Sequence, residues 1–114
     1  MLFYHDLPED DRDFWFSKLC GQSPAVFTVP IHLKASELRV PSMYLIAEND
    51  RILPVEVQER MVAAVPGIKT MRLSCGHSPF LSHPDETVEV IVKGAELRQL
   101  EMKAPHFDGM RSLT

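Results

Sequence analysis

The spacing of apolar and polar positions changes along the second half of the chain, and each change predicts a different element. Residues 43–47 (MYLIA) form an unbroken apolar run, which is typical of a strand covered on both faces within a parallel sheet. Residues 70–75 alternate instead, with Met71, Leu73 and Cys75 on one side. This second pattern predicts a strand at or near the edge of a sheet.

Helical spacing follows each of these two strands. The first helix is expected to begin at Pro54 and to end at Pro66-Gly67. Its apolar positions recur at four-residue steps and are Val57, Met61 and Val65. The second helix is expected to begin at Pro84, with an apolar face made of Val88, Ile91, Val92 and Ala95. The order strand, helix, strand, helix predicts an α/β unit with parallel strands and a right-handed connection.

The first 36 residues have a weaker pattern. A helix is expected from the Asp6-Leu7-Pro8 start, with Asp6 as its cap, to about Leu19. Its apolar stripe is expected to be buried and pairs Trp15 with Leu19 and Phe16 with Cys20. Residues 23–36 contain two prolines and have no period, so they predict a connector with at most a brief strand in AVFTV.

The composition is that of an ordinary globular protein. The 114 residues are 45% hydrophobic and 25% charged, which predicts one domain with a packed core. The net charge of −4 argues against binding to nucleic acid or to an anionic membrane surface, because both need a basic patch. Only two cysteines occur, with no targeting segment and no apolar run of about 20 residues, so we expect reduced thiols and a cytoplasmic location.

Two polar side chains follow the two predicted strands. Asp50 comes after the first strand and His77 after the second. The carboxyl ends of parallel neighbouring strands meet at one edge of a sheet, so both turns are expected to project there. A histidine held in one tautomer by a carboxylate is the acid–base pair that acyl transfer needs. Taken alone, an aspartate in a turn is more often a turn former, and a single histidine is more often a surface or capping residue.

At these residues the chain resembles a known fold family. YLIAENDRILP is similar to the acid strand and turn, and CGHSPFLSHPDE to the histidine turn, of α/β-hydrolases in a fungal and plant branch of esterases, methyl-ester hydrolases and hydroxynitrile lyases. The resemblance covers roughly residues 40–91 and implies that Asp50 is the catalytic acid and His77 the catalytic base. DLPEDDRDFWFSKL resembles the preceding cap segment. Many relatives have glycine where this chain has Glu48.

The resemblance implies a partial α/β-hydrolase fold, in which a cap-region helix precedes a strand-helix-strand-helix unit with parallel strands. It divides the chain into a cap-region helix and connector at 1–36, the C-terminal part of the hydrolase core at 37–104, and a tail at 105–114. No cofactor is expected.

A nucleophile for this pair is missing from the sequence. The family serine lies in G-x-S-x-G, which these 114 residues do not contain. The nearest string places Ser23 after a helix and before Pro24, which has no backbone N–H for an oxyanion. Ser78 is expected to shape the histidine loop. A Cys75 thiolate paired with His77 is the remaining option, although a thiol on the apolar side of a strand end is more often buried and inert.

We therefore expect the C-terminal portion of a serine α/β-hydrolase that acts on carboxylic esters and is inactive alone. The alternative is a non-catalytic interaction module derived from the same fold. In either case an open sheet edge favours self-association. No metal site is expected, because the other histidines show no metal-ligand spacing. These are His5, His32 and His106, together with His83, which is expected beside a helix start.

Overall fold

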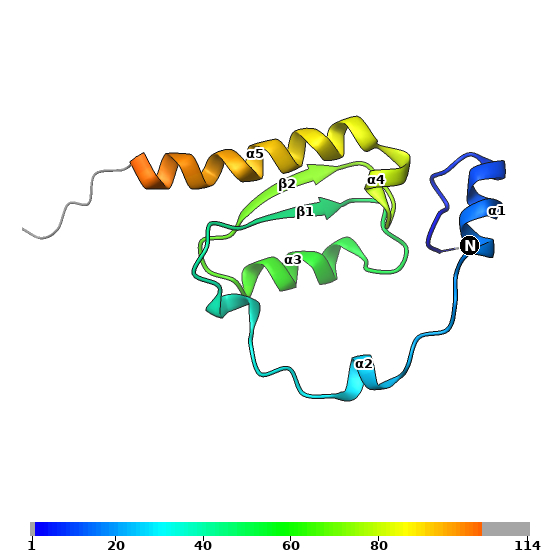
Figure 1. Ribbon diagram of the computed structural model, residues 1–114, viewed down its shortest axis with the longest axis horizontal. Helices are drawn as coiled ribbons and strands as arrows, with labels where there is room; N and C mark the ends of the chain where they lie inside the picture. Colours follow the sequence, from blue (N-terminus) through cyan, green and yellow to red (C-terminus); the bar gives the residue numbers. More distant parts are fainter. Residues whose placement is uncertain (1, 104–114) are drawn as a thin grey trace, which may run out of the picture.

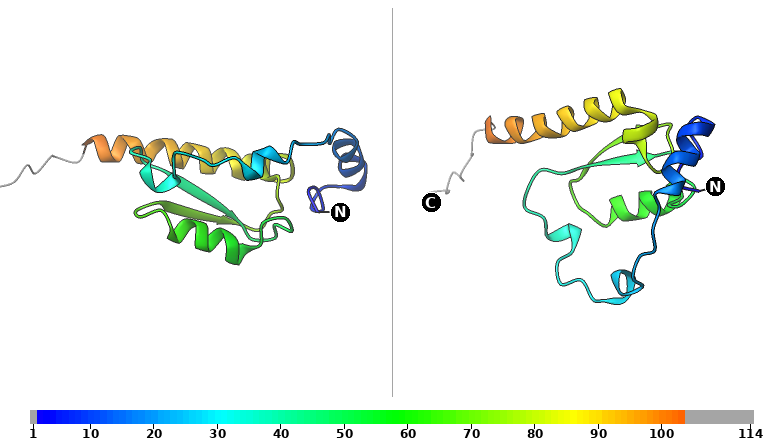
Figure 2. Two further views of the ribbon diagram at one scale, coloured as in Figure 1. Left: turned by 90° about the horizontal axis from the view of Figure 1, so that it is seen from below. Right: turned by 45° about the vertical axis from the view of Figure 1, so that its right-hand side comes forward.

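The computed structural model describes residues 2–103, which form a two-stranded parallel sheet with a helix on each side (Figure 1). Strand β1 (Met43–Ala47) pairs with β2 (Lys69–Leu73) so that Met43 is opposite Lys69 and Ala47 is opposite Leu73. Helices α3 (Val55–Ala63) and α5 (Pro84–Lys103) lie on opposite sides of this sheet, as a second view also shows (Figure 2). The predicted α/β unit with parallel strands is confirmed.

The carboxyl end of β1 is fixed to α3 by a buried glutamine. Gln58 is only 1% exposed. Its side-chain Oε1 accepts a hydrogen bond from the backbone N–H of Ala47 at 2.9 Å. Its Nε2 donates to the carbonyls of Ala47 and Leu53, at 2.9 and 2.7 Å. Because buried backbone groups need partners, this side chain completes the end of the strand where no third strand pairs with it. The apolar positions of α3, which recur every four residues, did not predict that Gln58 is buried and bonded to the end of β1.

Helix α5 packs on the sheet through a different face from the one predicted. Its half-buried positions are Thr87, Val90, Gly94 and Leu97. At Gly94, an added Cβ would lie 4.0 Å from the Cβ of Met43, so the helix passes close to β1 here. The predicted apolar face is exposed instead, with Val88 at 57%, Ile91 at 65% and Val92 at 49%. A two-stranded sheet is narrow, so it covers only one stripe of α5. The face that contains Val88, Ile91 and Val92 stays exposed.

The N-terminal helix α1 (Glu9–Ser17) departs from the prediction in two respects. Asp6 does not cap it: Pro8 occupies the cap position without a side-chain hydrogen bond, and the Asp6 carboxylate binds a distant backbone group. The stripe of Trp15, Phe16, Leu19 and Cys20 was predicted to be buried and is exposed. The reason is position, because α1 lies beyond the carboxyl ends of the strands, where no apolar sheet face is available to it (Figures 1 and 2).

The segment predicted as a connector is long and largely irregular, and it bows away from the sheet (Figure 1). The brief strand expected in AVFTV is wrong, because this stretch forms the short helix α2 (Ala25–Thr28). A single turn, η1 (Ala35–Glu37), precedes β1, and the short helix α4 (Pro79–Ser82), which the sequence did not predict, follows the histidine turn. Cys20 is exposed, Cys75 is buried, and both thiols are free. The tail predicted at 105–114 lies outside the described residues.

Candidate active site

Asp50 lies in a tight turn directly after β1. The ladder continues past the strand, since the N–H of Glu48 donates to the carbonyl of Leu73 at 2.9 Å. Oδ1 of Asp50 then accepts the N–H groups of Ile52 at 2.8 Å and Leu53 at 3.0 Å, which is an aspartate turn closed by its own side chain. Among the described residues, the only positive φ belongs to Gly67. Glu48 therefore occupies an ordinary backbone conformation, and the turn forms without the glycine that many relatives have.

His77 lies in the turn after β2 and meets Asp50 there. Nδ1 of His77 is 2.8 Å from Oδ2 of Asp50, the second oxygen of the carboxylate that closes the aspartate turn. The Asp50 side chain is 6% exposed and the His77 side chain 36%. The carboxylate is thus shielded while the imidazole still reaches solvent. The predicted meeting of these two side chains at one sheet edge is present in the structure.

The charge on Asp50 determines how the imidazole is held. Burial disfavours the carboxylate, but hydrogen bonds from the Leu53 N–H, from His77 and from the Ile52 N–H outweigh burial and lower the pKa of Asp50 below its ordinary value. An ionised carboxylate can only accept, so Nδ1 of His77 must donate in this contact. In the neutral imidazole, Nε2 then carries the lone pair and is the atom able to remove a proton.

A third segment, at the N-terminus, packs against the histidine turn. The backbone N–H of Gly76 donates to Oδ2 of Asp6 at 2.6 Å. The ring of Phe3 meets the His77 imidazole edge to face, with centroids 5.7 Å apart and an interplanar angle of 77°. Sequence reasoning missed both contacts, because Asp6 fits a helix cap equally well and no local pattern joins residues about 70 positions apart.

The candidate nucleophiles within the described chain are poorly suited to this pair. Cys75 is fully buried, and burial, with Asp6, Asp50 and Glu48 nearby, raises the pKa of its thiol to about 11. A thiol of this kind is protonated at neutral pH and inert, which argues against the thiolate option. Ser78 is 7% exposed at the start of α4. Ser23 lies just before α2, a helix that Figure 1 shows away from the carboxyl ends of the strands.

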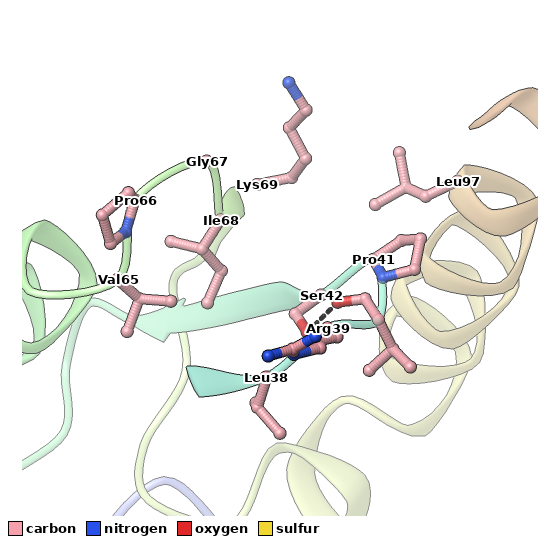
Figure 3. A pocket seen from close by; sticks show the side chains of 11 residues that line it. Leu38, Arg39, Pro41, Ser42, Val65, Pro66, Gly67, Ile68, Lys69 and Leu97 are labelled. Atoms are coloured by element: carbon pink, nitrogen blue, oxygen red, sulfur yellow. Dashed lines mark hydrogen bonds between the residues drawn. The ribbon is translucent and has the colours of Figure 1, made fainter. Parts of the chain in front are cut away.

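Two cavities lie at opposite ends of the strands. An open one of about 470 Å³ adjoins the pair and is lined by polar residues, namely His5, Asp6, Glu48, Asn49, Asp50 and Arg51. The other, of about 220 Å³, lies where the strands begin and is lined by Ile68 of the turn before β2 and by Leu97 of α5, among others (Figure 3). Of these two cavities, the first has Asp50 in its lining and the second does not.

Among residues 2–103, no group of three or more histidine, cysteine, aspartate or glutamate side chains is placed to hold a metal ion. Within the same range, no helix is both long and apolar enough to cross a membrane.

A parallel α/β unit that carries a hydrogen-bonded aspartate and histidine on the turns after its two strands has the organisation of the acid and histidine turns of hydrolases. The sequence profile of the alpha/beta hydrolase family matches residues 2–90, well over half of the 114 residues. The chain belongs to the alpha/beta hydrolase family.

Similar curated proteins come from a bacterium, a fungus and a plant. A pyrethroid hydrolase of Sphingobium wenxiniae is 32% identical over 73% of this chain and 31% of its own length. Alpha/beta hydrolase nvfD of Aspergillus novofumigatus is 37% identical over 71% of this chain and 33% of its own length. Methylesterase 17 of Arabidopsis thaliana is 32% identical over 54% of this chain and 22% of its own length.

A crystal structure of a pyrethroid hydrolase also matches. It superimposes with a TM-score of 0.59 at 27% identity, covering 83% of this chain and 38% of the solved one. The matched part of the chain therefore spans between about a fifth and two fifths of the length of these proteins.

Proposed function

We propose that this chain supplies the catalytic acid, Asp50, and the catalytic base, His77, of a serine hydrolase acting on carboxylic esters. The observation that carries the proposal is the 2.8 Å contact between Nδ1 of His77 and the shielded carboxylate of Asp50. Its support comes from membership of the alpha/beta hydrolase family and from a relative whose name identifies it as a methylesterase. A place within the fungal and plant branch remains a prediction.

In this role His77 accepts and then gives up a proton in each half of the reaction, while Asp50 stays ionised. Nε2 of His77 removes the proton of a serine hydroxyl as the serine oxygen attacks the ester carbonyl, and Asp50 stabilises the imidazolium that results. His77 then gives the proton to the leaving alcohol as the carbon–oxygen bond breaks, leaving an acyl-serine. In the second half, a water molecule gives a proton to the same nitrogen as its oxygen attacks the acyl carbon. His77 returns that proton to the serine oxygen as the acyl-serine bond breaks, which releases the carboxylic acid and restores the serine.

The serine and the oxyanion donors are proposed to come from residues other than these 114. The chain contains no G-x-S-x-G, and the side chains considered above are either buried or remote. The relatives are more than twice as long as this chain, which leaves room for both parts in a complete hydrolase. We accordingly propose that these residues are inactive as an isolated chain.

One observation favours a second candidate, a non-catalytic interaction module. The apolar face of α5 is exposed, and so are apolar side chains of the connector, with Phe27 at 80% and Ile31 at 81%. Such a surface binds another protein or a second copy of the chain. The catalytic proposal is preferred because a binding surface does not require a shielded carboxylate bonded to a half-exposed imidazole.

A chimera tests the catalytic proposal. Residues 2–103 replace the matching segment of the pyrethroid hydrolase, whose own N-terminal part would provide a nucleophile, and kcat/KM is measured with an activated aryl ester. We expect turnover that falls by about 10⁴-fold in Asp50→Asn, which favours the wrong tautomer, and at least as far in His77→Ala.

His32→Ala is the matched control for the chimera, because His32 is an exposed histidine of the connector and should leave kcat/KM unchanged. A folded chimera whose activity survives His77→Ala would refute the role of His77. A folded chimera that is inactive from the outset would show that these two turns do not complete a hydrolase site.

A further inference from the structure

The contact between Asp6 and Gly76 joins the first residues of the chain to the turn that carries the proposed base. The Gly76 N–H donates to Oδ2 of Asp6 at 2.6 Å, and the Asp6 side chain is 15% exposed. A local turn, closed by the Leu7 N–H on the Tyr4 carbonyl at 3.1 Å, presents the carboxylate, and Leu7 itself is buried. The N-terminal segment is therefore fixed by an apolar anchor beside its polar contact.

Gly76 is required here for space. A Cβ on this residue would lie 2.6 Å from Oδ1 and 2.7 Å from Cγ of Asp6, and 2.9 Å from Cε1 of His5. Such distances are far inside van der Waals contact. Gly76 does not have a positive φ, so backbone conformation does not require glycine. The close approach of the carboxylate to this peptide group is what excludes a side chain.

The same N-terminal segment touches the imidazole as well as the backbone before it. Phe3 packs edge to face on the His77 ring, while Asp6 holds the N–H of the preceding residue. Burial opposes the charge on Asp6, but the Ser82 hydroxyl and the Gly76 N–H lower its pKa, so the acceptor is a carboxylate and the hydrogen bond is charge-assisted. One segment thus restrains both the peptide and the ring of the proposed base.

We propose that Asp6 is a positioning residue that sets the backbone of the histidine turn, so that His77 meets Asp50 through Nδ1. This inference rests on the proposed function for its importance to catalysis, but the geometry can be tested without any turnover. Removing the acceptor leaves the Gly76 N–H without its partner, and the turn is then free to shift. A displacement of about 1 Å at a catalytic group is enough to cost about 100-fold in rate.

The test uses the full chain labelled with ¹⁵N-histidine, and magic-angle-spinning spectra report the tautomer of His77 whether or not the sample is monodisperse. The variants are Asp6→Ala, which removes the acceptor, and Asp6→Asn, which removes the charge but keeps an acceptor oxygen. Asp13→Ala is the control, since it deletes an exposed carboxylate from α1. Hydrogen exchange at Gly76 is followed in parallel by mass spectrometry.

Asp6→Ala is expected to mix the His77 tautomers and to speed exchange at Gly76 by about tenfold or more. Asp6→Asn keeps a neutral acceptor that makes a weaker hydrogen bond, so it is expected to fall between Asp6→Ala and the unaltered chain, and Asp13→Ala is expected to match the unaltered chain. An unchanged tautomer in Asp6→Ala would overturn the proposal, and so would an equal loss in Asp13→Ala, which would mean that the effect does not come from the contact with Gly76.

A second variant covers the case in which Asp6→Ala unfolds. Gly76→Ala forces a methyl group into the Asp6 carboxylate and should mix the tautomers in the same way. Because both changes break one contact, the double variant should be no worse than Gly76→Ala alone. Additive losses would mean that the two residues act independently, which contradicts the proposal. A chimera that fails to hydrolyse esters leaves this outcome untouched, so the two claims fail separately.

Discussion

The side-chain amide of Gln58 makes two hydrogen bonds with the backbone of Ala47, one to its N–H and one to its carbonyl, both at 2.9 Å. Ala47 is the last residue of β1, and the turn that carries Asp50 begins directly after it. The position of the proposed catalytic acid therefore depends on a helix residue that does not touch it.

Gln58→Leu should destabilise the contact between α3 and the end of β1. The change keeps the volume similar but leaves backbone groups of Ala47 and Leu53 buried without partners, at a cost of about 1–3 kcal/mol for each unpaired group. Hydrogen exchange at Ala47 and Glu48 measures the loss. Glu56→Ala, an exposed position of the same helix, should leave exchange unchanged. Equal exchange in the two variants would show that the Gln58 contacts contribute nothing.

Stability should depend on the ionisation of Asp50. Its pKa is lower in the folded chain than in the unfolded one, so its stabilisation is present above the unfolded value of about 4 and is lost as pH falls through the folded value. The free energy of unfolding should therefore fall on acidification below about pH 4. In Asp50→Asn this fall should be smaller, with Asp6 still contributing in the same direction. Circular dichroism melts measure this fall in both proteins. An equal fall on acidification in the unaltered chain and in Asp50→Asn would contradict its assignment to Asp50.

The two thiols should react very differently. Cys20 is exposed, whereas Cys75 is buried and its pKa is raised to about 11, so a thiol reagent at pH 8 should modify one cysteine in the native chain and two in denaturant. Cys20→Ser should abolish the native reaction and Cys75→Ser should not. Rapid modification of Cys75 in the folded chain would reopen the case for a cysteine nucleophile.

The isolated chain should self-associate. Val88, Ile91 and Val92 are 49–65% exposed on one helix, and the sheet formed by residues 2–103 has two strands. At about 25 cal/mol per Å² of apolar surface, leaving a few hundred Å² in water forgoes several kcal/mol, which is comparable to the stability of a whole domain. Sedimentation velocity should show oligomers or aggregates, reduced by Ile91→Glu. A monodisperse monomer with a sharp thermal melt would contradict this expectation.

The sequence predicted the parallel unit and the meeting of Asp50 with His77 because both follow from local patterns and chain order. An unbroken apolar run and a four-residue repeat each specify their element, and the carboxyl ends of parallel strands must lie together. Burial was predicted less well. The α1 stripe and the Val88 face of α5 have the spacing of core residues, but periodicity shows only that a face is apolar and not what covers it.

The contacts made by polar side chains could not be predicted from the sequence either. Gln58 and Asp6 bind backbone groups, which carry no side-chain signature, and Asp6 does so across 70 positions. A carboxylate before Pro8 fits a helix cap as well as a tertiary contact, so local rules favoured the nearer partner. Only the three-dimensional structure shows that the N-terminal segment packs against the histidine turn.

Labelling by a fluorophosphonate probe, which traps an activated serine, tests most directly whether Asp50 and His77 are the acid and base of a hydrolase site that lacks its nucleophile in this chain. The isolated chain, the chimera described above, and the chimera carrying His77→Ala are compared at equal concentration. We predict rapid labelling of the chimera alone, at a serine of its pyrethroid hydrolase part. His77-dependent labelling of the isolated chain, or labelling of the chimera that is equally fast with His77→Ala, would contradict that claim.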